Sequence, residues 1–309
     1  MLIGMIVVAF VALSLFALHY GYKLAFYYED PLMTPYEYEE SDQIAKCRLV
    51  LNSAIAEFEN APYEEVSITS HDGLKLMAKY YHVADGAPLE IHCHGYKGNA
   101  TRDFCGAYKI ACEAGHNVLL IDQRCHGKSE GHTITFGILE RQDVQGWIRY
   151  ANERFGNVPI ILCGVSMGAA TVLMVSGMEL PKNVKGVIAD CPYDAPSNII
   201  KKVLGQDMGM PVGIVYPLIR MGGLLYGKFD LDKDSPVEAV KRANIPILLI
   251  HGDDDRFVPY DMSKNIYAAA SEKISFHTIL GAGHALNYVT APVEYKAAVL
   301  AYYEKCLQK

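Results

Sequence analysis

One serine of this chain stands in a pattern that is typical of a catalytic nucleophile. Ser166 lies at the centre of a G-x-S-x-G pentapeptide at 164–168, between an apolar run at 158–163 and a helix-forming run at 169–174. A strand, a sharp turn and a helix in this order expose a serine hydroxyl at the end of a sheet. The two glycines leave room for the tight turn. The pattern therefore predicts nucleophilic chemistry at Ser166.

A serine hydroxyl attacks well only when a base takes its proton and a third group orients that base. Two later segments supply these residue types after apolar runs. The run 245–250 leads into three carboxylates at 253–255, and the run 274–280 leads into His284, which stands in a loop with glycines at 281 and 283. A serine, then an acid, then a histidine is a chain order that places a triad at one end of a sheet.

Taken together, these segments resemble the α/β-hydrolase superfamily. The pattern H-G-x-x-D-x-x-V-P at 251–259, followed by G-x-G-H at 281–284, is similar to the acid and histidine segments of that superfamily. The resemblance implies that Asp255 is the acid of the triad and that His284 is the general base. It covers roughly residues 62–308.

Three other carboxylates remain alternatives for the acid. Asp253 and Asp254 fill the free positions of the same pattern and are interpreted as solvated loop residues. Asp190 ends the apolar run 187–189, and some members of the superfamily place the acid there. The more complete pattern around Asp255 favours that residue.

An oxyanion hole is implied by the same resemblance. The strand-like run 89–93 ends in H-G-x-x-G at 94–98, which is similar to the oxyanion loop of the superfamily. The implied donors are the backbone N–H groups of Tyr96 and of Met167, the residue after the nucleophile. One such preorganised donor contributes on the order of 10²–10³ in rate.

Composition and motifs exclude several other functions. The chain has 309 residues and a formal net charge of −7, which disfavours nucleic acid as a partner. It has no P-loop and no dinucleotide-binding fingerprint, so we expect no cofactor. His92 and His94 flank Cys93, but zinc sites need three or four ligands at matched spacings, so we expect no metal.

The first segment predicts a membrane anchor. Residues 1–18 are almost wholly apolar, and as a helix they would reach about 27 Å, close to the thickness of a bilayer core. The first ten residues hold no Lys or Arg and no cleavage site follows, so an uncleaved single-pass anchor at 1–28 is favoured over a signal peptide. A helix buried against the domain is a further alternative, and the side of the membrane stays open.

The remaining chain predicts one large α/β domain. A helical linker at 29–61 precedes a catalytic domain at 62–309, in which strand and helix patterns alternate. This alternation predicts a mainly parallel, doubly wound sheet. An insertion at about 192–243 is rich in Gly, Met, Leu, Ile and Tyr. By resemblance it is a lid that covers the nucleophile and shapes a pocket for an apolar or aromatic acyl group.

The resemblance implies a serine hydrolase that cleaves carboxylic esters through an acyl-Ser166 intermediate. Its partners would be a small acyl ester substrate and, through the anchor, a membrane. Peptidases, thioesterases and acyltransferases use the same residues, so these activities remain alternatives. A catalytically inactive, membrane-anchored binding protein is the alternative of a different class.

Overall fold

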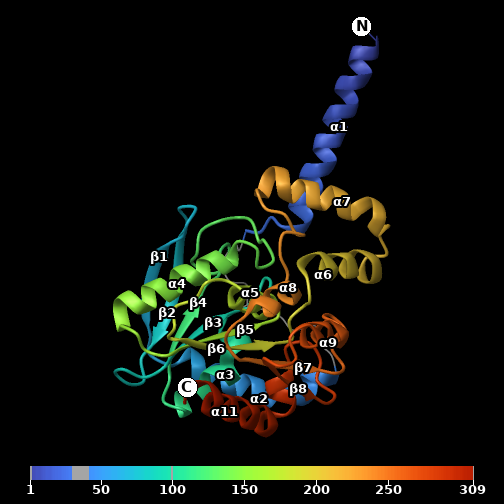
Figure 1. Cartoon of the computed structure of the whole chain (residues 1–309). Helices are drawn as coiled ribbons and strands as arrows, with labels where there is room; N and C mark the ends of the chain where they lie inside the picture. Colours follow the sequence, from blue (N-terminus) through green and yellow to red (C-terminus); the bar gives the residue numbers. More distant parts are fainter. Residues whose placement is uncertain (1, 30–41, 99, 309) are drawn as a thin grey trace.

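The computed structural model describes residues 2–29, 42–98 and 100–308. Its centre is an eight-stranded sheet in the order β1-β2-β4-β3-β5-β6-β7-β8, in which only the two pairings of β2 are antiparallel (Figure 1). The predicted mainly parallel sheet is confirmed. The strands are β1 (Glu64–Thr69), β2 (Lys75–Tyr81), β3 (Leu89–Cys93), β4 (Asn117–Ile121), β5 (Ile160–Val165), β6 (Val184–Asp190), β7 (Ile247–Gly252) and β8 (Ile274–Ile279).

Helices cover both faces of the sheet, as a doubly wound fold requires (Figure 1). Helices α4 (Glu140–Phe155), α5 (Met167–Ser176), α8 (Pro236–Arg242) and α9 (Tyr260–Ala269) lie on one face, and α2 (Asp42–Glu59), α3 (Ala100–Glu113) and α11 (Pro292–Leu307) lie on the other. A short helix, α10 (Asn287–Thr290), precedes α11.

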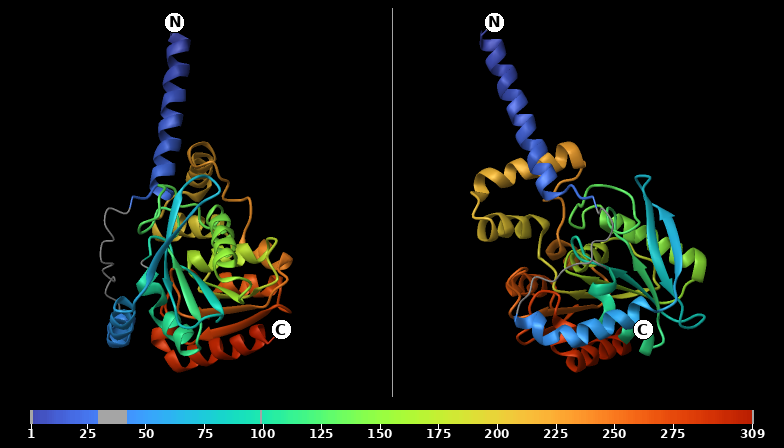
Figure 2. Two further views of the ribbon diagram at one scale, coloured as in Figure 1. Left: turned by 90° about the vertical axis from the view of Figure 1, so that its left-hand side faces the viewer. Right: turned by 180° about the vertical axis from the view of Figure 1, so that it is seen from behind.

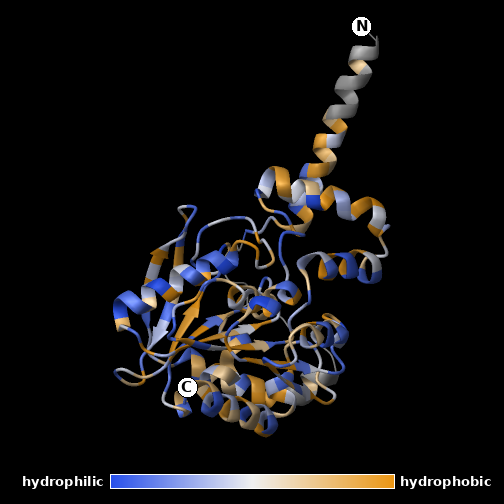
Figure 3. Ribbon diagram, in the orientation of Figure 1, coloured by the Kyte–Doolittle hydropathy of each residue, from blue (hydrophilic) through white to orange (hydrophobic). Residues whose placement is uncertain are grey.

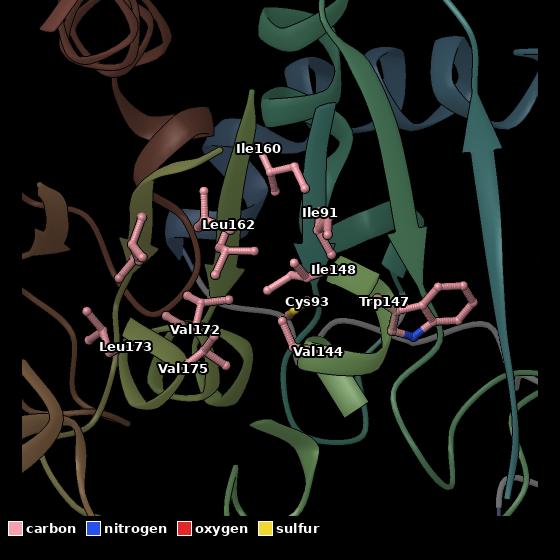
Figure 4. Close-up of a cluster of buried hydrophobic side chains, with 14 of the residues drawn as sticks. Ile91, Cys93, Val144, Trp147, Ile148, Ile160, Leu162, Val172, Leu173 and Val175 are labelled. Atoms are coloured by element: carbon pink, nitrogen blue, oxygen red, sulfur yellow. The ribbon is translucent and has the colours of Figure 1, made fainter. Parts of the chain in front are cut away.

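Strands β4 and β5 are buried along their whole length and mostly apolar, which is typical of parallel sheets (Figure 3). Leu119 of β4 packs towards α4, and its neighbour Leu120 packs towards α3. Figure 4 shows the first of these cores, where Trp147 and Ile148 of α4 lie against the sheet. A rigid core of this kind holds the ends of the strands, and therefore the loops after them, in fixed positions.

The insertion at 192–243 separates β6 from β7. It forms α6 (Pro196–Lys202), the π-helical turns η1 (Val203–Asp207) and η2 (Gly223–Gly227), and α7 (Val212–Gly222), before α8 returns to the core. Figure 1 shows α6 and α7 lying beyond the carboxyl ends of the strands, on the side where Ser166 follows β5. The insertion is thus placed to cover the nucleophile.

The N-terminal helix corrects one prediction. Helix α1 (Leu2–Ala25) projects from the body of the protein beside α7 (Figure 2). No helix in the part of the chain that the structure describes is long and apolar enough to cross a bilayer, so the predicted anchor at 1–28 is not supported. The last turns of α1 contact α7, Tyr22 of these turns is buried, and Phe26, just after the helix, is 0% exposed.

The segment between this helix and β1 was predicted as a helical linker at 29–61. Residues 30–41 lie outside the described residues. Helix α2 packs on α3, and Phe58 stacks on Tyr108 with ring centroids 4.0 Å apart. Leu51 and Ala54 of α2 are also buried, so this helix is built into the core of the domain.

A charged group lies deep in the core on the α3 side. Glu90 of β3 is 1% exposed and its carboxylate lies 2.9 Å from Nε2 of His92 and 2.8 Å from Nδ1 of His116. The hydroxyl of Tyr303 and the thiol of Cys163 also donate to it, at 2.6 and 3.3 Å. Burial alone raises the pKa of Glu90, but the bonds from the two imidazoles outweigh it and lower the pKa to about 2.

We expect Glu90→Gln to lower the free energy of unfolding by about 3–5 kcal/mol at pH 7. The substitution removes the carboxylate charge to which the buried neighbouring side chains are hydrogen-bonded. Folding lowers the pKa of Glu90, so its carboxylate stabilises the folded state fully at pH values above its ordinary pKa of 4.5. This stabilisation is lost as the pH falls towards about 2. Urea unfolding at pH 7 and pH 3.5 measures both effects. The difference in free energy of unfolding between parent and variant should be smaller at pH 3.5 than at pH 7. A larger difference at pH 3.5 would contradict a lowered pKa for Glu90.

Candidate active site

The turn that carries Ser166 is strained and crowded. Ser166 has φ +54° and ψ −117°, an unusual conformation for a residue with a side chain, and it is 8% exposed. A Cβ atom on Gly164 would lie 2.3 Å from the carbonyl oxygen of Gly168, and one on Gly168 would lie 1.8 Å from that of Cys93. Both glycines of the pentapeptide are therefore needed for the close approach of β3, β5 and α5.

The three residues predicted as a triad meet at the carboxyl ends of the strands. Nε2 of His284 lies 2.9 Å from Oγ of Ser166, and its Nδ1 lies 2.7 Å from Oδ2 of Asp255. With the carboxylate fixing the proton on Nδ1, Nε2 is free to accept the serine proton. The side chain of Asp255 is fully buried, whereas His284 is 22% exposed, as a base that meets substrate must be.

Further bonds hold the Asp255 carboxylate in place. Its Oδ1 accepts the backbone N–H groups of Phe257 and Val258 at 3.0 and 2.8 Å, and Nε2 of His251 lies 3.1 Å from Oδ2. Burial raises the pKa of Asp255, but the imidazoles of His284 and His251 outweigh burial and hold that pKa well below its usual range. The carboxylate is therefore charged throughout the neutral range.

The other candidate acids lie elsewhere. Asp190 is buried and accepts a bond from Nδ2 of Asn287 at 2.6 Å. Asp253 accepts a backbone N–H at 2.6 Å, and Asp254 pairs with an arginine at 3.2 Å. Of the four carboxylates that the sequence offered, the structure brings Asp255 to the histidine.

His251 is a residue of the site that sequence reasoning missed. Its ring bridges two side chains: Nε2 lies 3.1 Å from Oδ2 of Asp255, and Nδ1 lies 2.6 Å from Oγ of Ser263. The signal was present, because His251 is the first residue of the H-G-x-x-D pattern. Spacing alone did not show that this histidine turns back onto the carboxylate four residues later.

The predicted oxyanion loop lies directly beside the nucleophile. A Cβ atom on Gly95 would be 3.4 Å from Cβ of Ser166. The turn is fixed on both sides of Tyr96: Oδ2 of Asp103 accepts the N–H of Gly95 at 2.9 Å, and Nε2 of His126 accepts the N–H of Lys97 at 3.0 Å. Such anchoring preorganises the backbone donors of the loop.

Tyr96 and Met167 both border the pocket into which Ser166 opens. Met167 begins α5, and a residue in the first turn of a helix has a backbone N–H without an intrahelical acceptor. Both residues thus lie beside the nucleophile, and their role as oxyanion donors stays a prediction.

The pocket beside Ser166 has a volume of about 280 Å³ and an apolar wall. The insertion contributes five residues of α6, η1 and the turn after it, together with Ile219 of α7. Tyr193, near the start of the insertion, also lines the pocket, and Phe136, Phe257 and Val258 come from the body of the domain. Leu24 and Ala25 of α1 also line it, which the sequence did not predict. None of the described lining residues carries a charge.

The residues first weighed as metal ligands do not converge. His92 bonds Glu90, whereas His94 faces the carbonyl of Gly95 at 2.8 Å and accepts the N–H of Gln123 at 3.1 Å. Three groups in the described residues have ligand-type atoms within 4.8 Å of one another. They are Glu90, His92 and Cys163; Cys191, Asp255 and His284; and His71, Asp72 and Asp143.

The chain is similar to several known proteins. A family model described as serine aminopeptidase, S33, matches residues 91–213. The Bacillus subtilis protein YqkD is 26% identical over 224 residues, which cover 72% of this chain and 73% of YqkD. The Pyrococcus furiosus esterase Pf2001 is similar in structure, with a TM-score of 0.65 and 21% identity over 81% of this chain and 95% of that chain.

A second solved structure, Est1E from Butyrivibrio proteoclasticus with bound ferulic acid, has a TM-score of 0.62 and is 22% identical over 79% of this chain and all of that chain. Together with the strand order, these similarities show that the chain has the fold of the α/β-hydrolases, and the matching family model is one of serine hydrolases.

Proposed function

We propose that this chain is a serine hydrolase that cleaves carboxylic esters through an acyl-Ser166 intermediate. The observation that carries the proposal is the continuous set of hydrogen bonds from Ser166 through His284 to Asp255, at 2.9 and 2.7 Å. Distances of this size allow proton transfer without rearrangement of the site.

In the first half of the reaction, Oγ of Ser166 attacks the ester carbonyl carbon while Nε2 of His284 takes its proton. The N–H groups of Tyr96 and Met167 hold the negative oxygen of the tetrahedral intermediate. When that intermediate collapses, the bond to the alkoxy group breaks and His284 returns the proton to the leaving alcohol. Asp255 stabilises the imidazolium that exists between these two steps.

In the second half, water attacks the acyl-Ser166 ester. His284 takes a proton from the water and gives it to Oγ of Ser166 as the acid leaves. Net, one ester and one water become one carboxylic acid and one alcohol. No charge or redox change remains on the protein, so the cycle calls for no cofactor.

The pocket favours esters over the aminopeptidase substrates suggested by the name of the matching family model. An aminopeptidase must bind a charged ammonium group next to the bond that it cleaves. A carboxylate is the usual partner for that group, and none of the described residues that line the pocket is charged. The two esterases of similar fold support the same choice.

A panel of substrates tests the proposal. The full-length protein would be assayed with p-nitrophenyl esters from acetate to laurate, with an aminoacyl p-nitroanilide and with an acyl-CoA. We expect kcat/KM for at least one ester to exceed that for the anilide and the thioester by tenfold or more. Faster cleavage of the anilide would favour the peptidase, and transfer of the acyl group to an added alcohol in place of water would favour the acyltransferase.

The pH dependence follows from the charges of the triad. We expect kcat/KM to fall in a single step as the pH is lowered, because protonated His284 cannot take the serine proton. Asp255 causes no second loss of activity in the neutral range, since its pKa lies well below the usual value. Initial rates from pH 5 to 9 measure this profile. A rate that rises as the pH falls would rule out a neutral imidazole as the base.

A further inference from the structure

The last turn of α1 borders the same cavity as the nucleophile. Leu24 and Ala25 line the pocket together with Ser166, although they lie more than 140 residues earlier in the chain. The hydroxyl of Tyr96, another lining residue, points to the carbonyl oxygen of Ala25 at 3.5 Å. This end of α1 therefore occupies a position where it would meet a bound acyl group.

Close packing fixes α1 against the insertion. Its Gly21 lies against Ile219 of α7, and a Cβ placed on the glycine would be in ordinary contact with Cγ1 of the isoleucine, at 3.5 Å. A Cβ on Gly222 of α7 would lie 2.6 Å from the carbonyl oxygen of Leu18. Figure 2 shows α7 crossing the base of α1. The absence of a side chain at Gly222 lets the helices approach so closely that α1 and α7 form one wall.

The chain after α1 is tied to the body of the domain. Phe26 is 0% exposed, and its ring packs edge-on against Phe229 and Phe136, with centroids 4.9 and 6.1 Å apart. Its carbonyl oxygen accepts the N–H of Ile134 at 2.9 Å. Phe136 in turn stacks on Tyr96, with centroids 5.2 Å apart. The end of α1 is thus continuous with the packing behind the oxyanion loop.

We propose that the last turn of α1 is a wall of the acyl-binding pocket and sets which acyl chain lengths the enzyme accepts. This inference rests on the proposed ester hydrolysis and names its substrate class: esters of uncharged aliphatic acyl groups longer than acetyl. An apolar wall favours such chains because each methylene that it buries strengthens binding about fourfold. Leu24 and Ala25 are the residues of α1 that determine specificity.

Two opposite changes test the wall in the full-length protein. Ala25→Phe adds a ring to the cavity and should lower the ratio of octanoate to acetate kcat/KM at least tenfold. Leu24→Ala removes side-chain volume and should move the preferred p-nitrophenyl ester to a longer acyl chain. The matched controls are Ala12→Phe and Leu13→Ala, at exposed positions of the same helix, and both should leave the ratio within twofold of the parent.

The outcomes separate this inference from the proposed function. If the parent hydrolyses esters but Ala25→Phe and Leu24→Ala leave the chain-length profile unchanged, α1 is not a pocket wall. If the parent hydrolyses no ester, the proposed function itself fails. Loss of fold in Ala25→Phe would appear as lost acetate turnover and altered circular dichroism, and Leu24→Ala, which removes atoms from a 43% exposed residue, then decides the question.

Discussion

Replacing Ser166 by alanine should lower kcat for the best ester by a factor on the order of 10⁶. Loss of the serine of a triad removes the nucleophile, and the histidine then has no hydroxyl proton to accept. The remaining rate comes from substrate binding and the oxyanion donors. The fold should survive, because the change removes one oxygen atom from a turn whose close contacts are made by Gly164 and Gly168. Burst-phase and steady-state kinetics, with a thermal unfolding curve, measure both expectations.

Ser176 provides a matched control for this experiment. It is the last residue of α5, the helix that follows Ser166, is 2% exposed and donates to the carbonyl oxygen of Leu173 at 2.7 Å. Ser176→Ala should leave kcat within about twofold of the parent. If Ser166→Ala retained turnover within tenfold of the parent, Ser166 would not be the nucleophile.

The second large effect is expected for Asp255→Asn, which should lower kcat by a factor on the order of 10⁴. An amide in place of the carboxylate favours the imidazole tautomer with its proton on Nε2 of His284, so that the base can no longer accept from the serine. The loss of charge also removes the stabilisation of the imidazolium. Binding is affected less, so KM should change much less than kcat.

Asp190→Asn is the control for the acid. Asp190 is also buried, but its carboxylate bonds Asn287 and not the catalytic imidazole. We expect this variant to lower the melting temperature and to reduce kcat far less than Asp255→Asn does. A greater loss of kcat in Asp190→Asn than in Asp255→Asn would place the acid at the end of β6 and overturn the assignment.

The parts of the fold and site that the sequence predicted depend on local patterns at the ends of strands. Ser166, Asp255 and His284 follow β5, β7 and β8, which run parallel, so their carboxyl ends lie at one edge of the sheet. Alternating strand and helix patterns give the parallel order. Glycines at fixed positions mark the turns that bring these side chains together.

The parts that could not be predicted depend on contacts between distant segments. An apolar N-terminal segment such as 1–28 is compatible with lipid and with packing on protein, because burial in either removes its side chains from water. Only the fold shows that Tyr22 and Phe26 are buried by the insertion and by the loop at 133–136, and that Leu24 faces the pocket. The role of His251 was hidden for the same reason, since it depends on how a loop folds back.

The central claim is that Ser166 is a nucleophile activated by His284. Reaction of the full-length protein with a fluorophosphonate, followed by intact mass and peptide mapping, tests it most directly, because only an activated serine is marked. We predict a single adduct on Ser166, absent from Ser166→Ala and much slower to form in His284→Ala. An unlabelled protein, or an adduct on another residue with Ser166 unmodified, would contradict the claim.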